Sequence, residues 1–194
     1  VNKYKLTKGY VIIRLAKLTA HHDFGIKGIS YGLLGKLISI IESKSIQVYI
    51  SSEDTLDDEY ANYLLKINPK DMHQVLSSAS LLVCDSQSMS VEAAMLGVPS
   101  LRYSSLSGQI SILEELEHQY GLTYGINSKY PEVLISKLEE LLNMRNLRLK
   151  FQERKVKMIA DKIDVTAFLI WFIEDYPKSM KIMKETPNYQ YKFK

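Results

Sequence analysis

The densest group of potential ligand-binding residues lies between positions 84 and 99, in the run CDSQSMSVEAAMLGVP. A buried strand is expected to stop at Asp85, and a helix is expected to start near Ser90. The first amides of a helix lack intrahelical partners and carry the positive end of its dipole, so they can bind a phosphate. The hydroxyls of Ser86 and Ser88 can add further donors. This turn therefore predicts an anion-binding site.

Glu92 lies one turn into the same predicted helix, close to the expected phosphate position. A carboxylate there would repel a phosphate in direct contact, but it can accept hydrogen bonds from two neighbouring sugar hydroxyls, as acidic residues do for ribose. A purely structural interpretation stays open, because a serine N-cap at Ser90 followed by an acid in the first turn is how ordinary helices begin.

Strand and helix signals alternate along the chain, and these elements must position the turn. Strands are predicted over residues 11–15, 46–50, 80–85 and 98–103, and helices over 29–43, 56–65, 70–79, 90–96, 110–121 and 131–144. Repeated strand–helix units predict an α/β fold, a Rossmann-like parallel sheet flanked by helices on both faces. Ligands of such sheets bind beyond the carboxyl ends of the strands.

Two parts are expected within the chain. Residues 1–144 form the Rossmann-like domain, and residues 145–194 form a C-terminal helical extension with a basic tail that packs on it. The helical pattern of the extension is broken near residues 161–164. Because the chain lacks an initiator methionine and a strand-like segment begins almost at once, near Tyr10, we expect a further domain upstream of Val1.

Composition and charge exclude several partners. The chain has 194 residues, of which 46% are hydrophobic and 24% charged, as in ordinary soluble globular proteins. Residues 177–194 hold five lysines and one glutamate, a net +4, so the remainder carries −1. The body therefore lacks the charge of a nucleic-acid binder, and a solvated basic tail is favoured over contact with a membrane surface.

The location of the protein and several enzyme classes can also be addressed from the sequence. The single cysteine, Cys84, cannot form an internal disulfide, and no secretory signal opens the chain, so a cytoplasmic location is expected. A buried, inert thiol is favoured over a catalytic one, because no basic residue adjoins Cys84 in sequence. The glycine motifs of P-loop ATPases and NAD dehydrogenases and the serine motif of hydrolases are missing.

Two motifs resemble a known family. The run over residues 68–99 is similar to the second domain of UDP-N-acetylglucosamine 2-epimerases and related GT-B-fold glycosyltransferases, which carry "TDSGG" followed by "EEA…G.P". The matching residues are Asp85 and Ser86, then Glu92 and Ala93, then Gly97 to Pro99. Uncharacterised glycosyltransferase-like proteins of bacterial surface-polysaccharide clusters are a nearer alternative within the same superfamily.

A second match lies upstream, in TAHHDFGIKG at residues 19–28, which resembles the epimerase segment "TgHRREnfG.G". His21 falls on the active-site histidine of that family. The departures bear on the epimerase activity more than on nucleotide binding: His22 and Asp23 replace the arginines, and Gln87 and Ser88 replace two glycines, where their side chains narrow the approach to the backbone.

The resemblance implies a set of roles. His21 is the expected catalytic residue, and the expected nucleotide-binding residues are Arg14, Ser86, Gln87, Ser88, Met89, Glu92 and Arg102. Ser86 and the first amides of the helix would hold the diphosphate, Glu92 would bind the ribose hydroxyls, and Arg14 and His21 would face the cleft. From its position after a strand, Arg102 could reach a phosphate or equally pair with a surface acid.

The expected substrate is a nucleotide sugar, UDP-sugar first, with no cofactor and no metal ion. A metal site at His21-His22-Asp23 is the disfavoured alternative, because no supporting ligand spacing accompanies it. The chain is thus expected to be the donor-binding half of an enzyme of bacterial polysaccharide biosynthesis, inactive without its N-terminal domain. A non-catalytic interaction module with the same half fold is the alternative, and a homodimer is left open.

Overall fold

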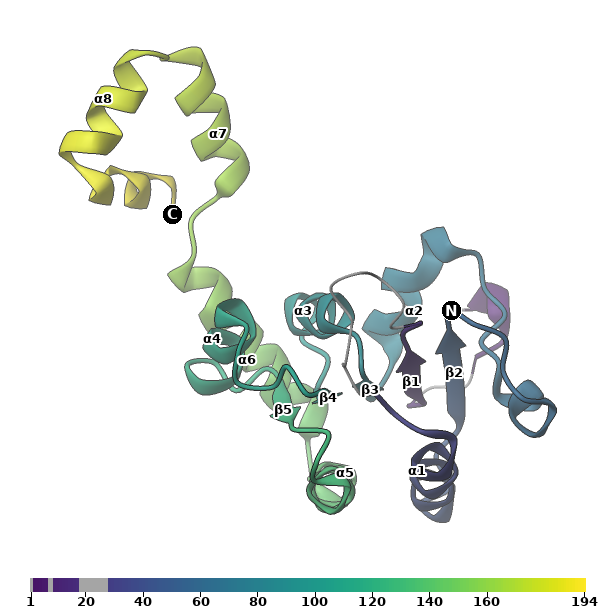
Figure 1. Ribbon diagram of the computed structural model, residues 1–194. Helices are drawn as coiled ribbons and strands as arrows, with labels where there is room; N and C mark the ends of the chain where they lie inside the picture. Colours follow the sequence, from purple (N-terminus) through teal and green to yellow (C-terminus); the bar gives the residue numbers. More distant parts are fainter. Residues whose placement is uncertain (1, 7–8, 18–27) are drawn as a thin grey trace. The chain divides into compact units, whose positions relative to one another are not determined.

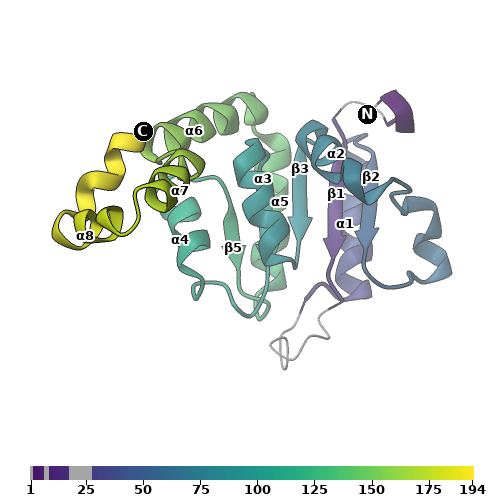
Figure 2. The same ribbon diagram turned by 90° about the horizontal axis from the view of Figure 1, so that it is seen from above.

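The computed structural model describes residues 2–6, 9–17 and 28–194. Five parallel strands form one sheet in the order β2-β1-β3-β4-β5 (Figure 1). The strands are β1 (Val11–Leu15), β2 (Val48–Ser52), β3 (Leu81–Cys84), β4 (Ser100–Tyr103) and β5 (Tyr124–Ile126). Figure 2 shows β1 running between β2 and β3. The predicted α/β fold with a parallel sheet is confirmed.

Helices cover both faces of the sheet (Figure 1). One face carries α1 (Tyr31–Ser43) and α5 (Pro131–Asn143), and the other carries α2 (Met72–Ser78), α3 (Gln87–Leu96) and α4 (Ser111–His118). Successive side chains of a strand point to opposite faces. Ile13 of β1 accordingly packs in the core under α1 and α5, while Ile12 packs in the core under α2 and α3. Both faces are buried, which explains the nearly continuous apolar strands.

Short 3₁₀ helices complete the connections. They are η1 (Asn2–Tyr4), η3 (Asp58–Tyr63), η4 (Pro69–Asp71) and η5 (Pro187–Phe193). The helical segment expected over residues 56–65 is a shorter helix of the 3₁₀ type, η3, which begins after Asp57 and ends before Leu64. The third strand is followed by a helix that begins at Gln87, three residues before the predicted start.

The first compact unit extends to Lys155, within α6 (Leu147–Asp161). Side chains from the first half of α6 donate to carbonyls at or just after the C-terminal ends of three helices, where carbonyl groups lack intrahelical partners. These bonds run from Arg148 to Ser77 (2.9 Å), from Gln152 to Leu96 and Gly97 (2.9 and 3.0 Å), and from Arg154 to Gly121 (2.7 Å). They join α6 to the amino edge of the sheet domain.

The second compact unit comprises residues 156–194 and contains α7 (Val165–Glu174), α8 (Lys178–Glu185) and η5. Its interior is a cluster of aromatic rings, with Trp171 stacked on Tyr189 at a centroid distance of 4.8 Å. Phe168 contacts both Trp171 and Phe172. The division of the chain at residue 144 stays a prediction. In the described residues, no helix has both the length and the apolar character required to cross a bilayer.

Candidate functional site

The order of the strands defines where a ligand crevice belongs. From β1 the chain passes to β2 on one side, whereas β3 lies on the other side of β1. Loops after β1 and β3 therefore lead to opposite faces of the sheet, and in folds of this strand order ligands bind at that point. Arg14 of β1 pairs with Cys84 of β3 across it. The turn predicted from the sequence, Asp85–Glu92, starts at this point.

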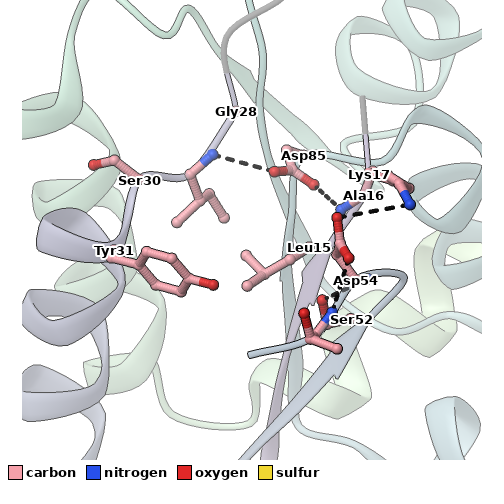
Figure 3. Close-up of a pocket in the computed structure, with 11 residues that line it drawn as sticks. Leu15, Ala16, Lys17, Gly28, Ser30, Tyr31, Ser52, Asp54 and Asp85 are labelled. Carbon is pink, nitrogen blue, oxygen red and sulfur yellow. Dashed lines mark hydrogen bonds and ion pairs between the residues drawn. The ribbon is translucent and has the colours of Figure 1, made fainter. Parts of the chain in front are cut away.

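Asp85 bridges the two ends of the connection between β1 and α1. Its buried carboxylate accepts hydrogen bonds from the amide of Ala16 at 2.7 Å and the amide of Ile29 at 3.1 Å (Figure 3). Burial raises the pKa of Asp85, against the effect of these two amides and of Arg14. The side chain thus positions the two ends of this connection, at Ala16 and Ile29. Sequence reasoning gave it no such role, although an acid directly after a buried strand was visible.

The N-terminus of α3 lies beside Asp85. Ser86 is the N-cap, and its hydroxyl accepts from the amide of Met89 at 3.4 Å. The amides of Gln87 and Ser88 are the first two of the helix and have no acceptor within it. The alternative in which Ser90 caps the helix is wrong. Ser90 is buried within α3.

Ser90 belongs instead to a buried cluster of three hydroxyl groups. Its oxygen lies 2.9 Å from the hydroxyl of Ser100 and 2.8 Å from that of Thr123. Each buried hydroxyl finds partners here, which offsets the cost of removing it from water. The cluster joins α3 to β4 and to the residue before β5, so it supports the helix start without contributing to the site.

Gln87 and Arg102 are joined behind the helix start. Arg102 is completely buried, and its Nη1 donates to Oε1 of Gln87 at 3.1 Å. The Gln87 side chain is therefore directed toward Arg102. In this position it does not narrow the approach of a ligand to the first backbone amides of α3 in the way expected from the sequence. Glu114 and Glu117 lie 3.5 and 4.0 Å from Nη2 of Arg102. Burial lowers the pKa of Arg102, and these two acids oppose that effect.

Ser86, Ser88 and Glu92 are brought together on α3. The Ser86 and Ser88 hydroxyls are 3.3 Å apart, and Glu92 follows Ser88 by one helical turn, with 36% of its side chain exposed. Glu92 also has a partner that the sequence did not suggest. Nε2 of His73, on α2, lies 3.1 Å from its carboxylate. Both side chains are accessible to solvent, so this contact can be replaced by a ligand.

Arg14 lies at the end of β1 with an acid beside it. Its guanidinium donates to the Ser51 hydroxyl at 2.9 Å and forms an ion pair with Glu53, which also accepts from the amide of Lys17 at 3.0 Å. Residues 51–54 begin no helix. Ser51 and Ser52 end β2, and Glu53 neutralises Arg14 instead.

Cys84 and the histidines near position 21 remain to be placed. The Cys84 thiol is fully buried, and burial, together with the charge of Asp85, raises its pKa to about 12, so it cannot serve as a thiolate nucleophile at neutral pH. His21, His22 and Asp23 lie outside the described residues. Across residues 2–6, 9–17 and 28–194, no three His, Cys, Asp or Glu side chains converge as metal ligands would.

A cavity of about 570 Å³ adjoins Asp85 on the side of α1 (Figure 3). It lies between the ends of β1 and β2 and the first turn of α1. Leu15 and Ile29 provide apolar lining, and Tyr31, Ser52, Asp54 and Thr55 provide an aromatic ring and polar groups. Tyr31 is not among the predicted site residues, because a tyrosine at a helix start has no distinctive spacing in the sequence.

Comparison with known proteins identifies the fold. No family model matches the sequence, and no curated protein matches it. Among solved structures, a glycotransferase of kitacinnamycin is 14% identical with a TM-score of 0.52, over 81% of this chain and 41% of its own. Medicago truncatula UGT71G1, solved with UDP-glucose, is 12% identical with a TM-score of 0.50, over 82% and 38%.

A third neighbour is the UDP-N-acetylglucosamine 2-epimerase of Methanocaldococcus jannaschii, solved with UDP-N-acetylglucosamine and UDP. It is 18% identical with a TM-score of 0.49, over 83% of this chain and 47% of its own. This chain therefore spans less than half the length of these solved proteins. The resemblance inferred from the motifs is confirmed at the level of the fold, which is similar to that of part of these two solved proteins.

Proposed function

We propose that this chain binds a nucleoside diphosphate sugar, with a UDP-sugar as first candidate. It would act as the nucleotide-binding domain of a glycosyltransferase or of an enzyme like UDP-N-acetylglucosamine 2-epimerase. One observation carries the proposal: the start of α3, with Ser86, two first-turn amides and Glu92, adjoins the point between β1 and β3 where such sheets bind ligands. Two enzymes with this fold, one of them solved with UDP-glucose, support it.

The chemistry follows from the charge that develops in such reactions. When the bond between the sugar and the diphosphate breaks, negative charge grows on the leaving diphosphate. The Ser86 hydroxyl and the amides of Gln87 and Ser88 are fixed donors at a helix N-terminus, where they stabilise that charge without a metal ion. Arg14 lies at the end of β1 and can add a cation only where a ligand displaces its ion-pair partner, Glu53. The amide of Met89 donates to the N-cap Ser86, which fixes the start of α3. Arg102 has an indirect role, because it holds the Gln87 side chain in place.

The groups that would carry out acid–base catalysis lie outside the start of α3. His21, which follows β1 in the sequence, is the catalytic candidate, and the general base would come from an N-terminal domain. On this view the present chain binds UDP or a UDP-sugar weakly and catalyses no turnover alone. A role in bacterial polysaccharide biosynthesis and a cytoplasmic location are parts of the same proposal.

Glu92→Ala tests the proposal directly. If the carboxylate binds the ribose hydroxyls, its loss should weaken UDP binding by about 1.5–3 kcal/mol, which is roughly a 10- to 150-fold rise in Kd. Isothermal titration calorimetry measures this, and Glu139→Ala, an exposed glutamate of α5, is the matched control. Equal affinities of the wild type and Glu92→Ala would remove the ribose role. Wild-type protein that binds no nucleoside diphosphate would refute the function itself.

The alternative, a non-catalytic interaction module, has one observation in its favour. Four apolar side chains of α7 are between 49% and 71% exposed, and apolar surface of this kind marks protein interfaces. They are Val165, Leu169, Ile170 and Ile173. Light scattering with and without UDP separates the two proposals, because a homodimer that does not respond to nucleotide supports the module.

A further inference from the structure

The cavity beside Asp85 contains polar and aromatic groups that nucleoside diphosphate binding leaves unused. It shares Asp85 and Ala16 with the loop after β1, and it opens between β1, β2 and the start of α1 (Figure 3). Its volume, about 570 Å³, lies in the range of small-molecule sites. The character of its walls indicates which part of a ligand it suits.

One wall is a rigid aromatic platform. Tyr31 is 42% exposed, and its ring stacks on the ring of Tyr60 with centroids 5.6 Å apart and planes within 6°. The Tyr60 hydroxyl also donates to the Tyr31 carbonyl at 3.2 Å, which adds a hydrogen bond to the stacking of the two rings. Leu15 and Ile29 continue this apolar surface. A platform of this kind receives the flat, C–H-bearing face of a pyranose ring.

The opposite wall is polar. Figure 3 shows Ser52 and Asp54 across the cavity from Tyr31, with Leu15 between. The backbone after β2 is held in place because Asp54 N donates to the Ser52 hydroxyl at 3.1 Å and Thr55 N donates to Asp54 Oδ1 at 3.0 Å. The Asp54 carboxylate faces Lys17 at 3.8 Å, and both side chains are half exposed, so this ion pair is weak. Sugar hydroxyls can replace it.

The two faces of the sheet indicate which part of the ligand lies in the cavity. Glu92, the proposed ribose partner, lies on the face covered by α2 and α3, whereas Tyr31 begins α1 on the other face. The start of α3 and Asp85 lie between them. A diphosphate at Ser86 therefore separates a ribose on one side from the group attached to its far end on the other.

We infer that this cavity holds the hexose of the bound nucleotide sugar, with Tyr31 under the ring and Asp54 accepting from its hydroxyls. The inference rests on the proposed function and assigns a part of the substrate to residues that the motifs do not include. It distinguishes two kinds of residue. Glu92 contributes to the affinity for every ligand that contains the nucleoside, whereas Tyr31 and Asp54 contribute only to the affinity for ligands that contain the sugar.

Calorimetry on the full chain tests this with UDP, UDP-glucose, UDP-galactose and UDP-N-acetylglucosamine as probes. In Tyr31→Ala, we expect Kd for at least one UDP-sugar to rise about 5- to 10-fold, and in Asp54→Asn about 10-fold, while Kd for UDP stays within twofold. Tyr31→Phe retains the ring and should bind as the wild type does. Tyr130→Ala, an exposed tyrosine before α5, is the control.

Each other outcome has a defined meaning. If Tyr31→Ala weakens UDP and the UDP-sugars equally, the cavity receives the nucleoside and the hexose assignment is overturned. It is also overturned if the wild type binds UDP but none of the three sugars, or if no cavity variant changes the ratio of the two affinities. Glu92→Ala distinguishes these results from a failure of the proposed function, because it should weaken UDP even when the hexose assignment falls.

Discussion

Asp85→Asn removes one oxygen acceptor from the bridge between Ala16 and Ile29. The wild-type carboxylate accepts both amides, at 2.7 and 3.1 Å, whereas the single carbonyl oxygen of asparagine satisfies one. A buried amide that loses its partner costs about 1–3 kcal/mol. Because burial raises the pKa of Asp85, the wild type already carries a desolvation cost that neutral asparagine lacks. We therefore expect a net loss of about 1–2 kcal/mol.

That loss corresponds to a decrease in Tm of about 2–8 °C for a chain of this size. Thermal unfolding followed by circular dichroism measures the decrease, and amide hydrogen exchange should show faster exchange at Ala16 or Ile29. Asp57→Asn is the matched control, because Asp57 is exposed and makes no capping bond through its side chain. An unchanged Tm with unchanged exchange at both amides would show that Asp85 does not hold Ala16 and Ile29 in place.

Two further predictions concern the interior. A Cβ at Gly125 would lie 2.5 Å from the buried Arg102, so Gly125→Ala should lower the free energy of unfolding by about 1–3 kcal/mol in urea titrations, whereas Gly32→Ala, with open space around it, should not destabilise. Cys84 should resist Ellman's reagent at pH 8. The pKa of Cys84 is about 12 in the folded protein and near 9 in the unfolded chain. The contribution of its protonated thiol to the free energy of unfolding is therefore complete below pH 9 and declines above pH 9. Wild type should therefore lose more stability than Cys84→Ala between pH 8 and 10.5.

Most elements could be predicted because their patterns are local. The run VIIRL is β-branched and continuous, and its strand has the predicted bounds. Gly97 ends α3 in the left-handed conformation, with φ of 68°, as its place after a helical run suggests. β5 was missed because it has only three residues, Tyr124–Ile126, and includes a glycine. A strand this short is defined by its pairing with β4, and pairing is not local information.

The site was predictable in part for the same reason. Ser86 and Glu92 belong to one turn and helix, so their proximity follows from the sequence. The burial of Arg102 does not, because it depends on acids from α4 that approach only when the sheet is assembled. The aromatic wall formed by Tyr31 and Tyr60 likewise joins segments 29 residues apart. The strand order, which locates the crevice, also requires the complete fold.

The first half of α6 has a consequence for how the gene product can be shortened. Arg148, Gln152 and Arg154 satisfy carbonyls at three helix ends along the amino edge of the sheet. A protein that stops at residue 144 would expose all of these carbonyls at once and would also lose Phe151, whose ring is completely buried. The opposite edge, where the ligand is proposed to bind, would keep every contact described above. The shortened protein should therefore be less stable, while the residues proposed to bind the nucleotide keep their arrangement.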